Sequence, residues 1–329
     1  MILDGHDLSS IAAAARSLQA GELIGLPTET VYGLAADASN EVAVASIFAA
    51  KGRPADHPLI VHVAEPGDAQ AFAREIPGFA DRLMQAFWPG PLTLILPRRA
   101  GVGAVAAGGQ DSIGLRCPSH PLAHAVLKAA RELGVPGVAA PSANRFGRVS
   151  PTTAQHVQEE FGQDLLILDG GACEVGIEST IVDCSRGAAV VLRPGRISRD
   201  QIQVVCGASL LQQDDLANPA PRASGTLAAH YAPNARVMLM DVQQLQAALA
   251  KLQDGSAPGS LAVYARTALH VPASVILRTM PAAPHDAEHE LFAVMRELDA
   301  KGVSSIWIEA PPDDLAWEGV RDRLSRAAA

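Results

Sequence analysis

Short apolar runs alternate with segments of helical character from the start of the chain to about residue 206. The apolar runs predict β-strands at about 22–26, 59–63, 92–96, 112–116, 137–140, 165–168, 178–183 and 188–192. The segments between them predict helices at about 8–19, 40–51, 68–74, 78–87, 120–133, 152–161 and 198–206. Strands interleaved with helices indicate an α/β fold, and the closely spaced strands late in the series favour a mixed sheet over a purely parallel one.

The periodicity fades between Gly207 and Pro233, where Gln, Asp, Pro and Gly replace the regular apolar positions. This composition is typical of a linker. A second series follows, with strands predicted at 236–241, 260–264, 274–278 and 303–309 and helices at 242–253, 286–301 and 314–326. We therefore predict a first domain over 1–206, a linker over 207–235 and a smaller α/β domain over 236–329.

The 329 residues carry 26 Lys and Arg against 35 Asp and Glu, which gives a net charge of −9 at pH 7. This balance argues against a protein that binds nucleic acid through a basic face. The N-terminal segment lacks the basic region of a secretory signal, no apolar run approaches the length of a membrane span, and the four cysteines form no CxxC pair. We expect a cytoplasmic protein with small buried thiols and no membrane partner.

The common motifs for nucleotides and metals are absent or weak. No GxxxxGK[ST] phosphate loop occurs. Residues 101–106 match GxGxxA, but neither a directly preceding strand nor a following helix is predicted, so a loop is favoured. His285 and His289 would share one helix face without a third ligand, and an exposed polar turn is favoured over a metal site.

Cations recur where predicted strands and helices end. Lys51 and Arg53 close a helix, while Arg116 and Arg193 each end a strand. Simpler explanations exist, because cations at a helix C-terminus can offset the helix dipole and His62 can be a histidine of the core. Ligands of open α/β sheets bind at strand ends, however, and together the four cations favour a crevice for a nucleotide or another phosphate.

Several short motifs follow one another between about residues 10 and 205. They are Pro27-Thr28-Glu29-Thr30-Val31-Tyr32-Gly33-Leu34, Lys51-Gly52-Arg53-Pro54 with Pro58-Leu59-Ile60-Val61-His62, Pro89-Gly90-Pro91-Leu92-Thr93, Arg116-Cys117-Pro118, Pro141-Ser142-Ala143-Asn144, Glu178-Ser179-Thr180 and Arg193-Pro194-Gly195. In this order they closely resemble the threonylcarbamoyl-AMP synthase family, whose core is a YrdC-like domain. His230-Tyr231-Ala232-Pro233 and the segment after it resemble the long form of the family, which has an additional C-terminal domain.

The resemblance implies a YrdC-like twisted mixed sheet with helices and a smaller Rossmann-like α/β domain at the C-terminus. It also implies an L-threonylcarbamoyladenylate synthase, a nucleotidyltransferase that combines L-threonine, bicarbonate and ATP into threonylcarbamoyl-AMP and pyrophosphate. Mg²⁺ would accompany ATP, and no tightly bound organic cofactor is expected. A separate tRNA threonylcarbamoyl transferase would then use the product to modify the adenosine beside the anticodon.

Their positions in the family pattern assign residues of this chain to the two substrates and to the reacting centre. L-threonine would contact Thr30, His62, Arg116, the backbone of Ala140, and Ser179, with Arg116 on the carboxylate. ATP would contact Arg53, His57, Ser112, Ser142, Ser150, Arg193 and Tyr231. The catalytic set would be Lys51, Arg53, Ser142 and Asn144. The chain departs from the pattern at His57, a position often filled by Asn, and at 223–226, where Ala-Ser-Gly-Thr replaces Ser-Pro-Gly-Met.

We expect the linker to fold over the nucleotide as a lid, with Tyr231 on ATP, and the alternative is a solvated tether between domains. Two other functions stay open. An RNA-binding or ribosome-maturation protein would use the concave positive surface of a YrdC-like domain, although the net charge of −9 favours at most a weak contact with RNA. A carbamoyl-transfer component of hydrogenase maturation would normally carry zinc-finger-like CxxC modules, which this chain lacks.

Overall fold

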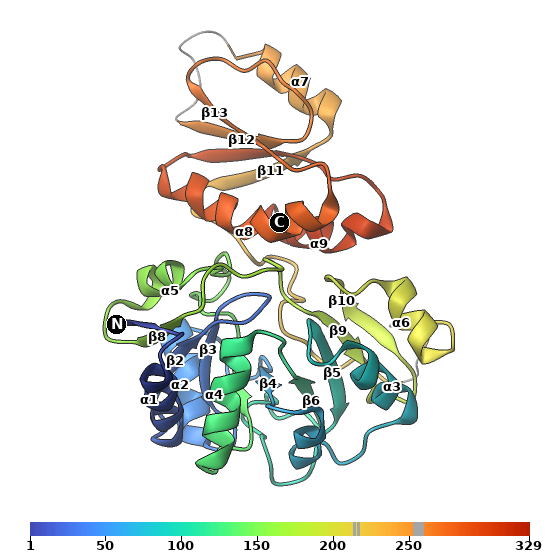
Figure 1. The fold of residues 1–329 in the computed structure, drawn as a ribbon. Helices are drawn as coiled ribbons and strands as arrows, with labels where there is room; N and C mark the ends of the chain where they lie inside the picture. The colour runs from blue at the N-terminus through green and yellow to red at the C-terminus, as the bar shows by residue number, and fades with distance from the viewer. Residues whose placement is uncertain (213–214, 216–217, 253–259) are drawn as a thin grey trace. The chain divides into compact units, whose positions relative to one another are not determined.

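The computed structural model describes residues 1–212, 215, 218–252 and 260–329 (Figure 1). The described residues form two compact units, the first made of Met1–Phe146 and Ser150–Thr226 and the second of Gly147–Val149 and Leu227–Ala329. The predicted domain boundaries at 206 and 235 stay a prediction. Residues 213, 214, 216 and 217 of the predicted linker, and residue 253 of the helix predicted over 242–253, lie outside the described residues.

The described part of the first unit is built on a ten-stranded sheet with the order β1-β8-β2-β3-β7-β4-β6-β5-β9-β10. The strands are β1 Ile2–Asp4, β2 Ile24–Leu26, β3 Gly33–Asp37, β4 Ile60–His62, β5 Leu92–Pro97, β6 Ser112–Arg116, β7 Val138–Ala139, β8 Leu166–Asp169, β9 Thr180–Asp183 and β10 Val190–Arg193. β4 runs parallel to β6, whereas β5 runs antiparallel to β6 and β9 antiparallel to β10. The predicted mixed sheet is therefore confirmed.

Helices cover both faces of this sheet. They are α1 Leu8–Gln19, α2 Glu41–Lys51, α3 Gly78–Phe87, α4 Pro121–Glu132, α5 Ala154–Phe161 and α6 Arg199–Cys206. α1 and α4 pack against each other and share one apolar cluster, while α2, α3, α5 and α6 contribute to a second cluster (Figure 1). Side chains of a strand alternate between faces, and in β3 Leu34 and Ala36 belong to the second cluster whereas Ala35 belongs to the first. The two clusters therefore lie on opposite faces of the sheet.

Two strands and one helix differ from the prediction. β1 and β3 were not predicted, because β1 is short and β3 is a run of small residues buried throughout, without polar alternation. The helix predicted at 68–74 is instead the 3₁₀ helix Pro66–Ala71. Glu65 and Asp68 cap each other's backbone at its start, which shifts the turn towards the N-terminus.

The second unit contains a four-stranded parallel sheet with the order β11-β14-β12-β13. Its elements are β11 Arg236–Met240, α7 Val242–Ala250, β12 Leu261–Ala265, β13 Val275–Thr279, α8 Pro284–Ala300, β14 Ser305–Glu309, the 3₁₀ helix Leu315–Trp317 and α9 Glu318–Ala327. α7 lies on one face of this sheet, and α8 and α9 lie on the other (Figure 1). This is the smaller Rossmann-like unit that was expected.

The described residues also bear on the cysteines and on membrane spans. All four cysteines, Cys117, Cys173, Cys184 and Cys206, are buried and none is in a disulfide, so the prediction of buried thiols is confirmed. Among the helices of the described segments, none is both long and apolar enough to cross a bilayer.

Candidate functional site

The register of the mixed sheet in the first unit explains how distant cations come together. His62 and Arg116 are direct partners at the C-terminal ends of β4 and β6. Arg193, at the end of β10, pairs with Ile181 of β9. Since β5 lies between β6 and β9 in the sheet, Thr93 near the start of β5 falls between these two pairs. The sheet therefore carries a row of polar side chains across neighbouring strands.

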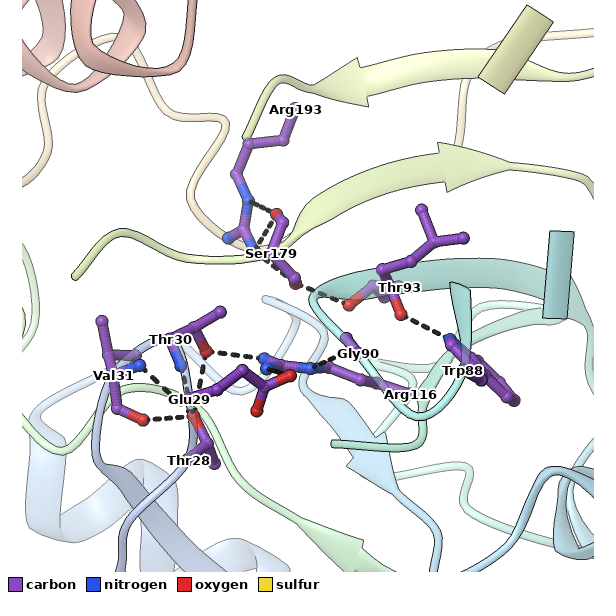
Figure 2. A network of polar contacts seen from close by, with 11 residues as sticks. Thr28, Glu29, Thr30, Val31, Trp88, Gly90, Thr93, Arg116, Ser179 and Arg193 are labelled. Carbon is purple, nitrogen blue, oxygen red and sulfur yellow. Dashed lines mark hydrogen bonds and ion pairs between the residues drawn. The ribbon is translucent and has the colours of Figure 1, made fainter. Parts of the chain in front are cut away.

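Arg116 has three polar partners in the protein (Figure 2). Its Nη2 lies 2.7 Å from Glu29 Oε1, and both side chains are almost completely buried. Its Nη1 donates to Thr30 Oγ1 at 2.8 Å and its Nε to the Gly90 carbonyl at 3.3 Å. Burial is the largest single influence on the pKa of Glu29 and acts to raise it, but the charge and contact of Arg116, together with backbone N–H groups at Ser119 and Glu29, outweigh burial and hold that pKa below its ordinary value. The result is a buried, fixed ion pair.

The loop between β2 and β3 presents Glu29 and Thr30 to Arg116. Thr28 Oγ1 donates to the Val31 carbonyl at 2.6 Å and accepts from the Thr30 and Val31 N–H groups at 3.2 and 3.3 Å. The Glu29 carbonyl accepts from the Val175 N–H at 2.7 Å. A hydroxyl that forms hydrogen bonds with the backbone of its own loop in this way stiffens the turn. The loop is thus a rigid support for two site residues (Figure 2).

His62 lies beside Arg116 as a neutral imidazole. Burial, together with the neighbouring charge of Arg116, lowers the pKa of His62 to about 3. Its Nδ1 is 3.3 Å from the Ile60 carbonyl, which also accepts from the Ala140 N–H at 3.0 Å. The Ala140 N–H is therefore engaged within the sheet, and its carbonyl is the backbone group that could meet a ligand.

Lys51, Ser142 and Asn144 come together as the family pattern predicts. The Lys51 ammonium donates to the Ser142 carbonyl at 2.6 Å and to the Asn144 carbonyl. Lys51 is the last residue of α2, and Gly52 ends that helix with φ 64°, which turns the chain sharply. Burial, reinforced by the charge of Arg53, lowers the pKa of Lys51 well below its ordinary value.

Arg53 and Arg193 meet at Ser224. Arg193 donates from Nε and Nη2 to the Ser179 carbonyl at 3.0 and 2.9 Å and from Nη1 to the Ser224 carbonyl at 2.8 Å. Arg53 Nη2 donates to Ser224 Oγ at 3.4 Å. Ser179 Oγ is 2.7 Å from Thr93 Oγ1, which joins Arg193 to the row across the sheet (Figure 2). The predicted convergence of these two cations is observed, with a residue of the predicted linker between them.

A small cleft opens beside this meeting point within the first unit. Strands β4, β5, β6 and β9 form one wall, and residues 222–224 form the other. Polar lining comes from Thr93, Gln110, Ser112, Arg222 and Ser224. Ser112 therefore lines the same cleft as Ser224, the residue that bridges Arg53 and Arg193.

The remaining predicted residues have other neighbours. Ser150 donates to Glu178, and His57 lies edge-on to Phe146 with ring centroids 5.4 Å apart. Tyr231 belongs to the second unit, where it stacks on Phe292 at 5.4 Å. Its contact with ATP stays a prediction.

Comparisons of the sequence with family models give two matches that together span most of the chain. The model described as Telomere recombination (Sua5_yciO_yrdC) matches residues 16–195, and the model described as Threonylcarbamoyl-AMP synthase, C-terminal domain, matches residues 197–329. Threonylcarbamoyl-AMP synthases of Pyrococcus abyssi and Bacillus subtilis are each 36% identical to this chain over 97% of its length, covering 94% and 92% of those proteins. The chain belongs to the threonylcarbamoyl-AMP synthase family.

Solved structures of the family support the fold. The crystal structure of Pyrococcus abyssi Sua5 complexed with L-threonine matches with a TM-score of 0.89 at 33% identity, covering all of this chain and 97% of that one. A variant of the same protein, with an adjacent histidine and tyrosine both replaced by alanine, matches with a TM-score of 0.88, also at 33% identity, covering all of this chain and 96% of that one.

The site also contains residues for which the sequence predicted no role. Glu29 and Thr93 lie inside quoted motifs, so the signal was present, but their partners Arg116 and Ser179 are far away in sequence. Ser224 lies in the segment that departs from the family pattern. A strand-end cation predicts an anionic partner, and the structure supplies one from within the protein, Glu29.

Proposed function

We propose that this protein makes threonylcarbamoyl-AMP and pyrophosphate from L-threonine, bicarbonate and ATP at the site in its first unit. The observation that carries the proposal is the state of Arg116. A guanidinium has five N–H donors, and within the described residues Arg116 uses one in a hydrogen bond to Thr30 and one in a hydrogen bond to Gly90, while its Nη2 forms an ion pair with Glu29 without a hydrogen bond. Donors stay available for a substrate carboxylate, and a relative at 33% identity has been solved with L-threonine.

L-threonine binds around the row formed by His62 and Arg116. Arg116 takes the carboxylate, and the neutral His62 and the hydroxyls of Thr30 and Ser179 lie within the same buried group. The carbonyl of Ala140 completes the set as an acceptor. Because these groups are buried and already oriented, little rearrangement is needed when the amino acid arrives.

ATP binds over the cleft and the Lys51 turn, with Mg²⁺ entering as part of the MgATP substrate. Arg53 and Arg193 hold phosphate oxygens, since both guanidinium groups converge on Ser224 at the edge of the cleft. Ser112 and Ser142 supply polar contacts. His57, Ser150 and Tyr231 are proposed as further residues that contact the nucleotide.

The chemistry needs positioning more than it needs a strong acid or base. The threonine ammonium first loses a proton to solvent, the neutral amine attacks the carbon of bicarbonate, and loss of water leaves a carbamate. A carbamate oxygen then attacks the α-phosphorus of ATP, and the bond to the β-phosphate oxygen breaks to release pyrophosphate. Bicarbonate, the carbamate, the threonine carboxylate and the ATP phosphates are all negatively charged, so Lys51 and Arg53 lower the barrier by offsetting charge repulsion, with the main-chain carbonyls of Ser142 and Asn144 holding the Lys51 ammonium in place.

The product is a reactive mixed anhydride, which a separate tRNA threonylcarbamoyl transferase uses to modify the adenosine beside the anticodon.

The test is pyrophosphate release from ATP by the full chain, with mass spectrometry of the nucleotide product. Release should require both L-threonine and bicarbonate, and the product should be threonylcarbamoyl-AMP. Folded protein that releases no pyrophosphate under these conditions, or releases it equally without threonine, contradicts the proposal.

A further inference from the structure

We propose that Glu29 is a positioning residue for the substrate amino acid: it fixes the Arg116 guanidinium so that two defined N–H groups face the threonine carboxylate. This inference rests on the proposed function, because it concerns the same threonine site. Glu29 would not touch the reacting atoms. Its role would be to set the orientation of the residue that does bind the carboxylate.

The geometry shows how one carboxylate can set that orientation. An arginine side chain has many rotamers, and a guanidinium held at a single point can still rotate. Arg116 is held at three points that lie around its guanidinium, by Glu29 at Nη2, Thr30 at Nη1 and Gly90 at Nε. Glu29 is the only charged member among these three, and its carboxylate, 2.7 Å from Nη2, holds the guanidinium by charge attraction rather than by a hydrogen bond.

Glu29 is itself held by its surroundings. It is 2% exposed, and its loop is tied internally by the Thr28 hydroxyl and externally by the Val175 N–H. The close view shows the carboxylate lying against the Arg116 guanidinium with Thr28 and Thr30 beside it (Figure 2). A rigid support is what a positioning residue needs, since precise placement of a binding group depends on the shell behind it.

The pair also explains how a buried guanidinium is tolerated before substrate arrives. A buried cation without a counter-charge is strongly disfavoured, and Arg116 is 4% exposed. Glu29 supplies that counter-charge without using all the donors. The ion pair therefore balances the charge of Arg116 while still leaving donors for a carboxylate.

The central experiment compares Glu29→Gln with the unaltered full chain. Glutamine keeps the shape and one acceptor oxygen but removes the charge that fixes Arg116. The KM for L-threonine should rise about tenfold, the cost of weakening one charge-assisted contact, while the KM for ATP should stay within about twofold. Direct titration with L-threonine by calorimetry should show the same loss of affinity.

Glu309→Gln is the matched control. Glu309 is a buried carboxylate of the second unit that accepts from Arg266 Nη2 at 2.8 Å, so its substitution weakens a comparable ion pair elsewhere in the protein. This variant should lower the melting temperature without changing either KM. Should Glu29→Gln not fold, Glu29→Asp keeps the charge but shortens its reach, and the same selective rise in the threonine KM is expected.

Three results would overturn the inference. The threonine KM of the Glu29 variant could stay unchanged, it could fall because Glu29 merely competes with the substrate, or the two KM values could rise together as for general loss of structure. If the unaltered chain releases no pyrophosphate, the proposed function fails. The calorimetric titration still tests Glu29 in that case, because threonine binding does not depend on turnover.

Discussion

The ammonium of Lys51 lies 2.6 Å from the main-chain carbonyl of Ser142, at a turn where a helix end meets the chain that follows strand β7. A buried ammonium that donates to neutral carbonyls keeps its charge available to an incoming anion, whereas one paired with a carboxylate would not. Burial lowers the pKa of Lys51 because it disfavours the charged ammonium. The negative charge of a bound phosphate would offset this effect by stabilising the ammonium.

Lys51→Met should therefore reduce turnover strongly and leave the protein folded. Methionine retains most of the volume but no charge, and loss of one preorganised electrostatic contact typically lowers kcat about a hundredfold or more. Steady-state pyrophosphate release and a melting curve measure the two effects. Lys128→Met, which removes an exposed lysine that pairs with Glu65, is the control and should change neither. Normal turnover together with a large drop in melting temperature would mean that Lys51 is structural.

Arg116→Lys should raise the L-threonine KM about tenfold to a hundredfold, corresponding to the roughly 1.5–3 kcal/mol of a charge-assisted contact. Lysine keeps the positive charge beside Glu29 but cannot offer paired donors to a carboxylate. It is preferable to alanine, which would leave Glu29 buried without its counter-charge and cost about 3–5 kcal/mol of stability. A fall in ATP affinity with threonine binding untouched would show that Arg116 serves the nucleotide instead.

Acid should destabilise the protein partly through His62. The pKa of His62 is about 3 in the folded protein against an ordinary 6.5, so below pH 6.5 the unfolded chain binds a proton that the folded protein does not. Stability contributed by the neutral imidazole is fully present above about pH 6.5 and is lost as the pH falls towards 3. The fall in unfolding free energy between pH 7 and 4, measured by urea denaturation, should be smaller by a few kcal/mol in His62→Gln. The exposed His6→Gln should behave like the unaltered chain, and an unchanged slope in the His62 variant would contradict the prediction.

Substrates should protect the predicted linker from proteolysis. Ser224 bridges Arg53 and Arg193, so phosphate binding to these arginines is expected to order the chain around it. Cleavage between Gly207 and Pro233, followed by mass spectrometry, should slow when ATP and threonine are added together. Equal cleavage rates with and without substrates would favour a simple tether.

Tyr231→Phe should weaken ATP binding if the hydroxyl contacts the nucleotide. Tyr231 is 1% exposed and stacked on Phe292, so alanine would also remove core volume and confuse the result. Phenylalanine keeps the ring and isolates the hydroxyl. ATP titration should show a loss of severalfold with a melting temperature close to that of the unaltered chain. Unchanged ATP affinity would confine Tyr231 to packing within the second unit.

The sequence by itself determined the elements whose signals are local. The helix that begins at Glu41 follows its capping residue Asn40 and ends at Gly52, and all three positions are visible in the sequence. Apolar runs likewise predicted most strands, and the ordered motifs were specific enough to indicate the family on their own. Such features depend on residues within a few positions of one another, which is why they can be read along the chain.

Only the tertiary structure decided which distant residues meet. The strand order of the first sheet, the pairing of Glu29 with Arg116 and the meeting of Arg53 with Arg193 at Ser224 all join segments far apart in sequence. Strand β3 escaped prediction for the same reason, since its small residues are buried by helices that pack on both faces and leave no polar alternation. Strand pairing and ion-pair formation depend on what the rest of the chain brings alongside, and no local pattern encodes that choice.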